Sequence, residues 1–254
     1  MSGTGYAFRD TAPAASRLTL LNILWEPSSA PFIGSYAPVR AELAYDLGCG
    51  PGWTTRLLTD LAAPKRVVGL DESESFVELA RQLHPVPEFS VHDVTRAGFP
   101  AGPADLMFCR MLLTHLEQPV AALETWAGEL RHGGVLLVDE VEAITTDEPV
   151  FARYLELAAG LIGKRGGRLY VGAELEAARP ARLRRLGSEG AYLAPDPRSI
   201  ALLFRMNLRV WRDSPDAGAS QGELDDVAAG LRRINSDGGG AITWTMRQIA
   251  YEAA

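Results

Sequence analysis

Hydrophobic residues follow two alternating patterns through the first half of the chain. Short apolar runs, bounded by polar residues or glycine, predict buried strands at residues 44–47, 66–70, 89–91, 105–109 and 135–138. Between these runs, apolar residues recur with the three- and four-residue spacing of a one-faced helix, around residues 57–62, 76–83 and 120–130. Because parallel strands need a crossover connection, this alternation predicts an α/β fold with a doubly wound, mostly parallel sheet.

The pattern changes toward both ends of the chain. An irregular arm rich in small residues precedes a predicted helix over 17–25, which Pro27-Ser28-Ser29 should end. After Val138 the alternation stops, and we expect an insertion over 143–185 that contains an extra helix. Two later helices and a terminal strand are predicted at residues 197–211, 223–234 and 242–251.

Composition narrows the classes of function mainly by exclusion. Of the 254 residues, 47% are hydrophobic and 22% charged, which is typical of a globular protein with a large core. The net charge of −7, without a Lys or Arg run, argues against nucleic acid or an anionic membrane as the main partner. The N-terminus lacks the pattern of a leader peptide, and no apolar run is long enough for a membrane span. Cys49 and Cys109 do not have the spacing of a metal site or a disulfide framework, so we expect no metal and a cytoplasmic location.

A glycine-rich loop carries the first chemical signal. Gly48, Gly50 and Gly52 alternate between the first predicted strand and the helix after it. Glycine lets the backbone approach a ligand closely, and amides at a helix start favour an anionic group. A dinucleotide fingerprint needs its third glycine at position 53, where this chain has Trp53. Trp53-Thr54-Thr55 does not supply the Gly-Lys-Ser/Thr end of a P-loop either, so ATP hydrolysis is excluded.

Two carboxylates complete the signal at the ends of the next predicted strands. Asp71 ends the second strand, where a carboxylate can accept hydrogen bonds from both ribose hydroxyls of a nucleoside. Asp93 ends the third strand and can accept from the exocyclic amine of adenine, although an aspartate there can also start a turn. The three strand ends together are far more specific than any one of them.

With these motifs the segment 44–140 resembles the class I methyltransferases that use S-adenosylmethionine (SAM). The resemblance implies one SAM-dependent methyltransferase domain over residues 1–254, whose product from SAM is S-adenosylhomocysteine (SAH). It divides the chain into an N-terminal arm and helix, a SAM-binding core, a helical insertion with lid elements and a terminal strand, at residues 1–40, 41–142, 143–235 and 236–254. The resemblance implies a Rossmann-like sheet of seven strands, in which the last strand is an antiparallel seventh strand beside the fifth.

The resemblance also assigns roles to individual residues. Asp46, Gly48 and Gly50 match the loop around the methionine part of SAM, with Cys49 contributing its backbone amide. Asp71 and Glu72 match the ribose site, whereas Phe76, Asp93 and Val94 match the adenine site, and Arg110 matches a backbone contact to the methionine end. Tyr6 and Arg17 of the N-terminal arm are candidates to close over the cofactor.

Residues for the transfer step are harder to assign, because methyl transfer needs mainly alignment and sometimes removal of a proton. His115, just beyond the fourth strand, is our candidate catalytic base, although it could instead cap or pack beneath the cofactor. Glu140 and Glu142 are alternatives, but loop carboxylates are more often plain solvated charges. Candidate walls of an acceptor pocket, each also compatible with core packing, are Tyr154, Tyr170, Tyr192, Phe204 and Trp211.

The sequence favours a small-molecule acceptor that is methylated at an O, N or C atom, and a secondary metabolite is a candidate for it. The fourth motif lacks the Asn/Asp-Pro-Pro-Tyr/Phe sequence that in this family signals methylation of nucleobases or glutamine, so nucleic acid is not expected as a partner. A homodimer is compatible with the sequence. Two other hypotheses stay open: a SAM-binding protein that acts as a non-methylating cyclase or a regulator, and a nicotinamide oxidoreductase, which Trp53 disfavours.

Overall fold

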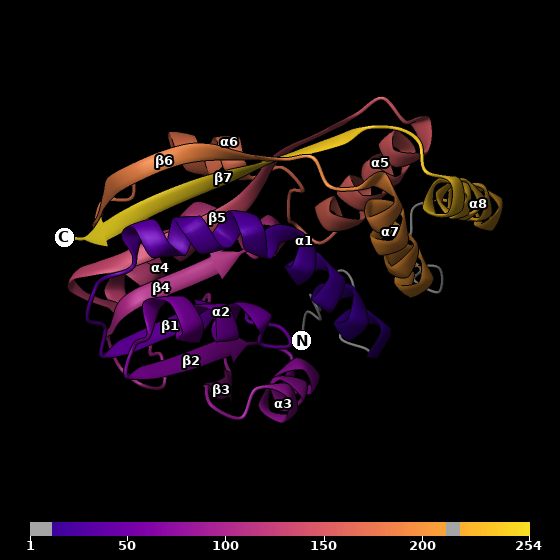
Figure 1. Ribbon diagram of the computed structural model, residues 1–254. Coiled ribbons are helices and arrows are strands. Elements are labelled where there is room, and N and C mark those ends of the chain that lie inside the picture. The colour runs from indigo at the N-terminus through magenta and orange to yellow at the C-terminus, as the bar shows by residue number, and fades with distance from the viewer. Residues whose placement is uncertain (1–11, 212–218) are drawn as a thin grey trace.

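The computed structural model describes residues 12–211 and 219–254, which form a seven-stranded sheet with helices packed against it (Figure 1). The strands lie in the order β3-β2-β1-β4-β5-β7-β6. Their bounds are β1 Leu43–Leu47, β2 Arg66–Asp71, β3 Glu88–Val91, β4 Ala104–Arg110, β5 Leu130–Thr146, β6 Leu183–Leu193 and β7 Ile242–Ala253. The helices are α1 Ala12–Tyr36, α2 Trp53–Ala62, α3 Glu74–Leu83, the 3₁₀ turn η1 Leu113–His115, α4 Pro119–Gly128, α5 Pro149–Gly163, α6 Gly172–Ala177, α7 Pro197–Trp211 and α8 Gln221–Asp237.

Strand pairing confirms the predicted doubly wound, mostly parallel sheet. β1 to β5 pair in parallel, whereas β7 runs antiparallel between β5 and β6. All five predicted early strands are present, and β7 lies beside β5 as the resemblance implied. Because the first five strands are parallel, their carboxyl ends meet at one edge, which is where open α/β sheets bind ligands.

The two faces of the sheet are covered by different helices. Buried side chains of α2 and of the second half of α1 pack on one face, including Leu57, Leu58, Phe32 and Ile33. On the other face, Leu123 and Trp126 of α4 pack with α6 and with the outer strands. Every residue of β1 is buried, as expected for a central strand covered on both faces.

The first helix extends well beyond its predicted end, so the prediction that Pro27-Ser28-Ser29 stops it is wrong. α1 runs through Pro27 and Pro31, and both prolines are exposed. The carbonyl groups that these prolines leave without an amide donor therefore lie on the solvent side, where water can satisfy them. Burial of Trp25, Phe32 and Ile33 holds the inner side, so tertiary packing overrides the local signal.

The later part of the chain holds a strand that the sequence pattern did not reveal. β6 lies inside the segment 143–235, which was predicted to be helical, and it forms the edge of the sheet. Its buried and exposed positions do not alternate strictly, and four of its eleven residues are the polar Arg184, Arg185, Ser188 and Glu189. The helices predicted at 151–162, 197–211 and 223–234 are confirmed as α5, α7 and α8.

A second hydrophobic core lies beyond the carboxyl ends of the parallel strands. β5 and β7 extend past their neighbours and carry α5, α7 and α8 at that end of the molecule (Figure 1). In this core Trp25 of α1 packs edge-on against Trp244 of β7, with ring centroids 4.5 Å apart. Within the described residues, no helix is both long and apolar enough to cross a bilayer.

Candidate active site

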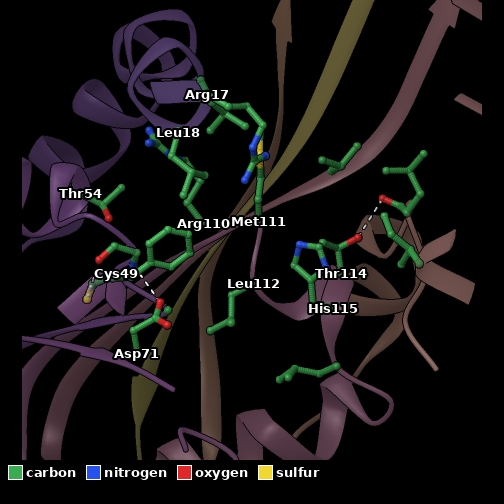
Figure 2. A pocket seen from close by; sticks show the side chains of 18 of the residues that line it. Arg17, Leu18, Cys49, Thr54, Asp71, Arg110, Met111, Leu112, Thr114 and His115 are labelled. Carbon is green, nitrogen blue, oxygen red and sulfur yellow. Dashed lines mark hydrogen bonds between the residues drawn. The ribbon is translucent and has the colours of Figure 1, made fainter. Parts of the chain in front are cut away.

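A cavity of about 460 Å³ opens at the carboxyl edge of the parallel strands, between the sheet and the second core. Its walls come from the glycine-rich loop and the ends of β2 and β3 on one side and from η1, α5 and α7 on the other. Figure 2 shows Cys49 and Asp71 on the first side and Thr114 and His115 on the second. We call these two sides the nucleoside end and the acceptor end.

The glycine-rich loop takes a shape that other residues resist. Gly48, Gly50 and Gly52 have φ angles of 67°, 51° and 88°, all in the left-handed region. A Cβ at Gly48 would lie 2.7 Å from Leu112 Cδ1, and one at Gly52 would lie 2.8 Å from His84 and Phe89. The glycines are thus needed both for the backbone turn and for close packing, and Gly48 and Gly50 line the cavity.

Asp46 does not line the cavity, unlike the glycines that follow it. Its carboxylate is buried and accepts hydrogen bonds of 2.6 Å from the hydroxyl groups of both Thr54 and Thr55. Burial raises the pKa of Asp46 to about 6, against the lowering effect of the two threonines. In this structure Asp46 ties the end of β1 to the start of α2 and so supports the loop from behind.

Cys49 lies in the cavity wall but is not a reactive thiol. Its side chain is 4% exposed, and burial raises the pKa of the thiol well above its usual value. The backbone amide of Cys49 donates to the carbonyl oxygen of Leu70, which fastens the loop to the end of β2.

Asp71 stands at the centre of the nucleoside end. Its Oδ2 accepts a 2.8 Å hydrogen bond from the Gly50 amide and its Oδ1 accepts one of 2.9 Å from the Ser73 amide. Each carboxylate oxygen has a further lone pair, so the side chain can also accept from ligand hydroxyl groups. Asp71 therefore shapes the glycine-rich loop and faces the cavity at once.

The other predicted nucleoside residues also line the cavity: Glu72, Phe76, Asp93 and Val94. Phe76 and Val94 are buried and offer apolar surface. Asp93 accepts hydrogen bonds from the amide and the hydroxyl group of Thr95, so it forms the local turn that the sequence allowed as an alternative. Its Oδ2 pairs with the exposed Arg96 at 3.0 Å, and an exposed ion pair of this kind is weak enough to leave a ligand contact compatible with the turn.

Arg110 links the cavity to α1. Its guanidinium donates to Ser29 Oγ at 3.1 Å and to Asn22 Oδ1 at 2.8 Å, both on α1. Ser29 in turn donates to the buried carboxylate of Asp139 at 2.7 Å. Because Arg110, Ser29 and Asp139 come from β4, α1 and β5, this network fixes α1 across the cavity, where Arg17 and Leu18 reach into it (Figure 2).

Glu140 shapes the turn that carries His115, and the sequence interpretation of Glu140 as a solvated loop carboxylate is wrong. Glu140 is fully buried within β5, and its Oε1 accepts hydrogen bonds of 2.7 Å from the amides of Leu112 and Leu113. Burial raises its pKa to about 8, against the lowering effect of these amides. Met111, which precedes the turn, has a φ of 53°, a strained conformation that this anchoring stabilises. Glu142 is also not a free loop charge, because it pairs with Arg247.

His115 lies on η1 and lines the acceptor end of the cavity. Burial, together with the positive charges of Arg17 and Arg165, lowers its pKa to about 3. Arg17, 3% exposed, comes from α1, and Arg165 from the turn that follows α5. The imidazole is therefore uncharged at neutral pH and stands in a positively charged environment.

The remaining wall of the acceptor end is aromatic and aliphatic. Tyr154 stacks on Phe204 with centroids 3.7 Å apart, and both line the cavity. Trp211 stacks behind Tyr154 at 5.1 Å and does not reach the cavity wall. Tyr170 and Tyr192 are 41% and 78% exposed and lie outside the wall. Of the five predicted wall residues, the structure thus brings Tyr154 and Phe204 to the cavity, and Tyr6 lies outside the described residues.

Sequence patterns gave no signal for several residues of this end. Arg165, Asn207 and Trp244 line the cavity, yet Arg165 lies in the turn after a predicted helix, and apolar periodicity predicts only a helix or a strand at the other two. Their positions depend on how α5, α7 and β7 pack at the end of the sheet, which local spacing does not encode. In the part of the chain that the structure describes, no cluster of three or more His, Cys, Asp or Glu side chains could hold a metal ion.

Comparisons with known proteins agree with this geometry. Residues 45–138 match a family model described as a methyltransferase domain. Trans-aconitate 2-methyltransferase from an Azoarcus species is 40% identical over 98 residues, which are 39% of this chain and 38% of that protein. The chain thus spans about two fifths of the length of this curated relative.

Solved structures extend the likeness across the fold. A putative methyltransferase from Bacillus halodurans superposes with a TM-score of 0.59 at 14% identity, covering 94% of this chain and 98% of that one. Coclaurine N-methyltransferase, solved with N-methylheliamine and SAH, has a TM-score of 0.53 at 14% identity and covers 93% of this chain and 72% of its own. Residues 45–138 are thus similar in sequence to a methyltransferase domain, and the chain as a whole has the fold of these solved methyltransferase structures.

Proposed function

We propose that this chain transfers a methyl group from SAM to an O, N or C atom of a small-molecule acceptor. The observation that carries the proposal is a single cavity that joins the glycine-rich loop and Asp71 to a second, apolar compartment. Its volume of about 460 Å³ falls in the range of about 300–1,000 Å³ that is typical of small-molecule sites.

The residues of the nucleoside end fit SAM. Gly50 has no side chain to fill the space for the methionine part, Gly48 lets the loop pack against Leu112, and Asp71 offers its carboxylate to the ribose hydroxyl groups. Phe76 and Val94 offer buried apolar surface for the adenine ring. When bound, SAM supplies an electrophilic methyl group and leaves as SAH. Asp46, by contrast, acts through the loop that it supports.

We assign three tasks to the chain's own residues during transfer. α1, fixed by Arg110 and Ser29, excludes water from the cavity, which strengthens polar interactions inside it. The η1 turn, held by Glu140, positions His115 at the acceptor end. The uncharged imidazole of His115 is placed to align the acceptor by a hydrogen bond, whereas a pKa of about 3 makes it a weak general base at neutral pH.

Trans-aconitate is a specific candidate acceptor, because a relative that is 40% identical over part of its length bears that name. The shared part is less than half of either protein, and the residues that line the acceptor end are mostly apolar. We therefore propose only the broader class of acceptor, a small molecule.

Calorimetry and labelled methyl transfer test the proposal together. We expect SAM and SAH to bind with dissociation constants on the order of micromolar, and labelled methyl to pass from SAM to at least one small organic acceptor. Absence of SAM binding would contradict the proposed function. Binding of SAM without transfer to any acceptor in a broad screen would favour the alternative, a SAM-binding cyclase or regulator. An absorbance change with NADH would revive the oxidoreductase hypothesis.

A further inference from the structure

A second, smaller cavity lies between α7 and α8, apart from the cavity at the sheet edge. Its volume is about 80 Å³. Three side chains from each helix line it: Arg205, Leu208, Arg209, Leu224, Ala228 and Arg232. The larger cavity meets α7 through Leu203, Phe204 and Asn207 instead. At 3.6 residues per turn these two sets lie on different sides of α7, so the two cavities are separate.

Packing of α7 against α8 brings the two lining faces together. Residues three and four apart share one face of a helix, and the lining residues of both helices follow this spacing. Arg198, near the start of α7, donates to the carbonyl oxygen of Asp237 at the end of α8, so the helices run antiparallel. Arg205 donates across the helices to Asn235 Oδ1 at 2.7 Å. The two helices lie next to each other at one end of the molecule (Figure 1).

Three guanidinium groups meet in this cavity without a carboxylate. No Asp or Glu of the described ranges lines it. Arg205 donates to the neutral amide of Asn235, and neither Arg209 nor Arg232 forms a hydrogen bond or ion pair with any residue that the structure describes. Arg205 and Arg209 are four residues apart on α7, a spacing at which like charges destabilise a helix. The dipole of α7 favours a cation in its last turn, which accounts for Arg209 but not for the other two arginines.

The floor between these cations is apolar. Leu208 and Leu224 are 5% and 3% exposed, and Ala228 is half-buried beside them. An anion that enters the cavity is therefore partly shielded from water, which strengthens its attraction to the guanidinium groups. The same floor can pack against an apolar part of a ligand next to its charged group.

Size and charge together select the kind of anion. Sites for whole drug-sized molecules have volumes of about 300–1,000 Å³, so a cavity of about 80 Å³ has room for one small group. Guanidinium groups bind carboxylate and phosphate by paired, charge-assisted hydrogen bonds. A carboxylate has two oxygens for three arginines, whereas a phosphoryl group has three terminal oxygens and a charge of about −1.5 to −2 at pH 7. A phosphoryl group therefore matches this cavity better.

We propose that the cavity between α7 and α8 is a binding site for a phosphoryl group, which Arg205, Arg209 and Arg232 hold above the floor of Leu208 and Leu224. The group is free phosphate or the phosphoryl end of a larger molecule whose body lies outside the cavity. The site is separate from the cofactor and from the acceptor end. It therefore goes beyond the proposed methyltransferase function and does not depend on it.

Calorimetry on the full chain tests the proposal, with SAH present to occupy the nucleoside end. The probes are inorganic phosphate, phenyl phosphate and benzoate at one ionic strength, because exposed charges are screened by salt. We expect saturable binding of at least one phosphate probe, about 10-fold tighter than that of benzoate. Tighter binding of phenyl phosphate than of inorganic phosphate would identify a phosphate ester as the source of the group. Equal or weaker binding of phenyl phosphate would identify free phosphate.

Substitutions then assign the binding to this cavity. Arg209→Ala and Arg232→Ala should each raise the dissociation constant of the tighter phosphate probe about 10-fold, and Arg209→Lys should retain part of the affinity. Arg233→Ala is the matched control, because Arg233 is the exposed neighbour of Arg232, carries the same charge and does not line the cavity. Its affinity should stay within about 2-fold of that of the unchanged protein. Thermal unfolding without phosphate checks that each variant is folded.

Three results would each overturn the proposal. The first is the absence of saturable binding for both phosphate probes, and the second is binding of benzoate as tight as that of the phosphates. The third is an equal loss of affinity in Arg209→Ala and Arg233→Ala, which would show attraction by the net charge rather than a site. Failure of SAH to bind bears on the methyltransferase function alone, because the phosphate titrations of the variants can still be compared.

Discussion

The nucleoside end and the acceptor end of the cavity are built in different ways. The nucleoside end is assembled from consecutive strand ends between residues 46 and 94, and its carboxylate chemistry depends on local turns. The acceptor end draws on α1, η1, α5, α7 and β7, which are far apart in the sequence, and its wall is mostly apolar. A site for a common cofactor can thus be carried by short motifs, whereas a site for a particular acceptor depends on how distant elements pack.

The comparison predicts its largest effect at Asp71. In Asp71→Ala the SAM dissociation constant should rise about 100-fold, because the ribose hydroxyl groups and the Gly50 amide lose their common acceptor. Calorimetry with SAM measures this change. Asp60→Ala, which removes an exposed carboxylate paired with Arg56, should leave the affinity unchanged. Unchanged affinity in Asp71→Ala would remove the basis for placing the nucleoside at this end.

The acceptor end depends strongly on one buried group, the carboxylate of Glu140. Glu140→Ala should lower the free energy of unfolding by about 2–3 kcal/mol, because it leaves the amides of Leu112 and Leu113 without an acceptor. Denaturant unfolding gives the stability, and SAH binding to the remaining folded protein checks the nucleoside end. Glu142→Gln, at a partly exposed ion pair with Arg247, should cost less than about 1 kcal/mol. Equal losses in the two variants would show that Glu140 has no special role.

The glycine-rich loop should respond to a single methyl group. Gly52→Ala should destabilise the protein by about 1–2 kcal/mol, because φ is 88° and the new Cβ would lie 2.8 Å from His84 and Phe89. SAM affinity should fall with it, since the loop must shift. Gly190→Ala, where the nearest atom to a Cβ is 3.5 Å away and φ is not positive, is the control and should change neither quantity. Unchanged stability and SAM affinity in Gly52→Ala would contradict the close packing at this position.

A last effect concerns pH. Burial raises the pKa of Glu140 from 4.5 to about 8 in the folded protein, so the folded state holds this proton more tightly than the unfolded chain does. Its contribution to stability is complete below about pH 4.5 and is lost as the pH rises toward 8. Over this range the free energy of unfolding of Glu140→Gln should therefore fall less than that of the unchanged protein. Parallel pH profiles of the two proteins would contradict the assignment.

The pKa of His115 is shifted in the opposite direction to that of Glu140. Its pKa is lowered to about 3, so its charge does not change between pH 5 and pH 8, and no ionisation of His115 should appear in the affinity for an uncharged ligand there.

The amino-acid sequence by itself determined the parallel part of the sheet and the nucleoside end. Strand–helix alternation, three glycines and the acids at the ends of β2 and β3 are local features, and each depends on only a few neighbouring residues. Phe76 and Val94 line the cavity as the motifs predicted, because their positions depend on the same local features. Only Asp46 behaved differently, because the hydroxyl groups of α2 turn its carboxylate away from the cavity.

Tertiary structure alone decided the continuation of α1 through Pro27, the strand β6, the burial of Glu140 and the presence of Arg17 and Arg165 in the same cavity wall as His115. Each of these results from contacts between segments that are far apart in the chain. Packing energy from Phe32 and Ile33 outweighs the local preference at the prolines, and strand pairing with β7 orders a segment whose own pattern is weak. The local spacing of apolar residues shows which face of an element is apolar, but it does not determine which other element packs against that face.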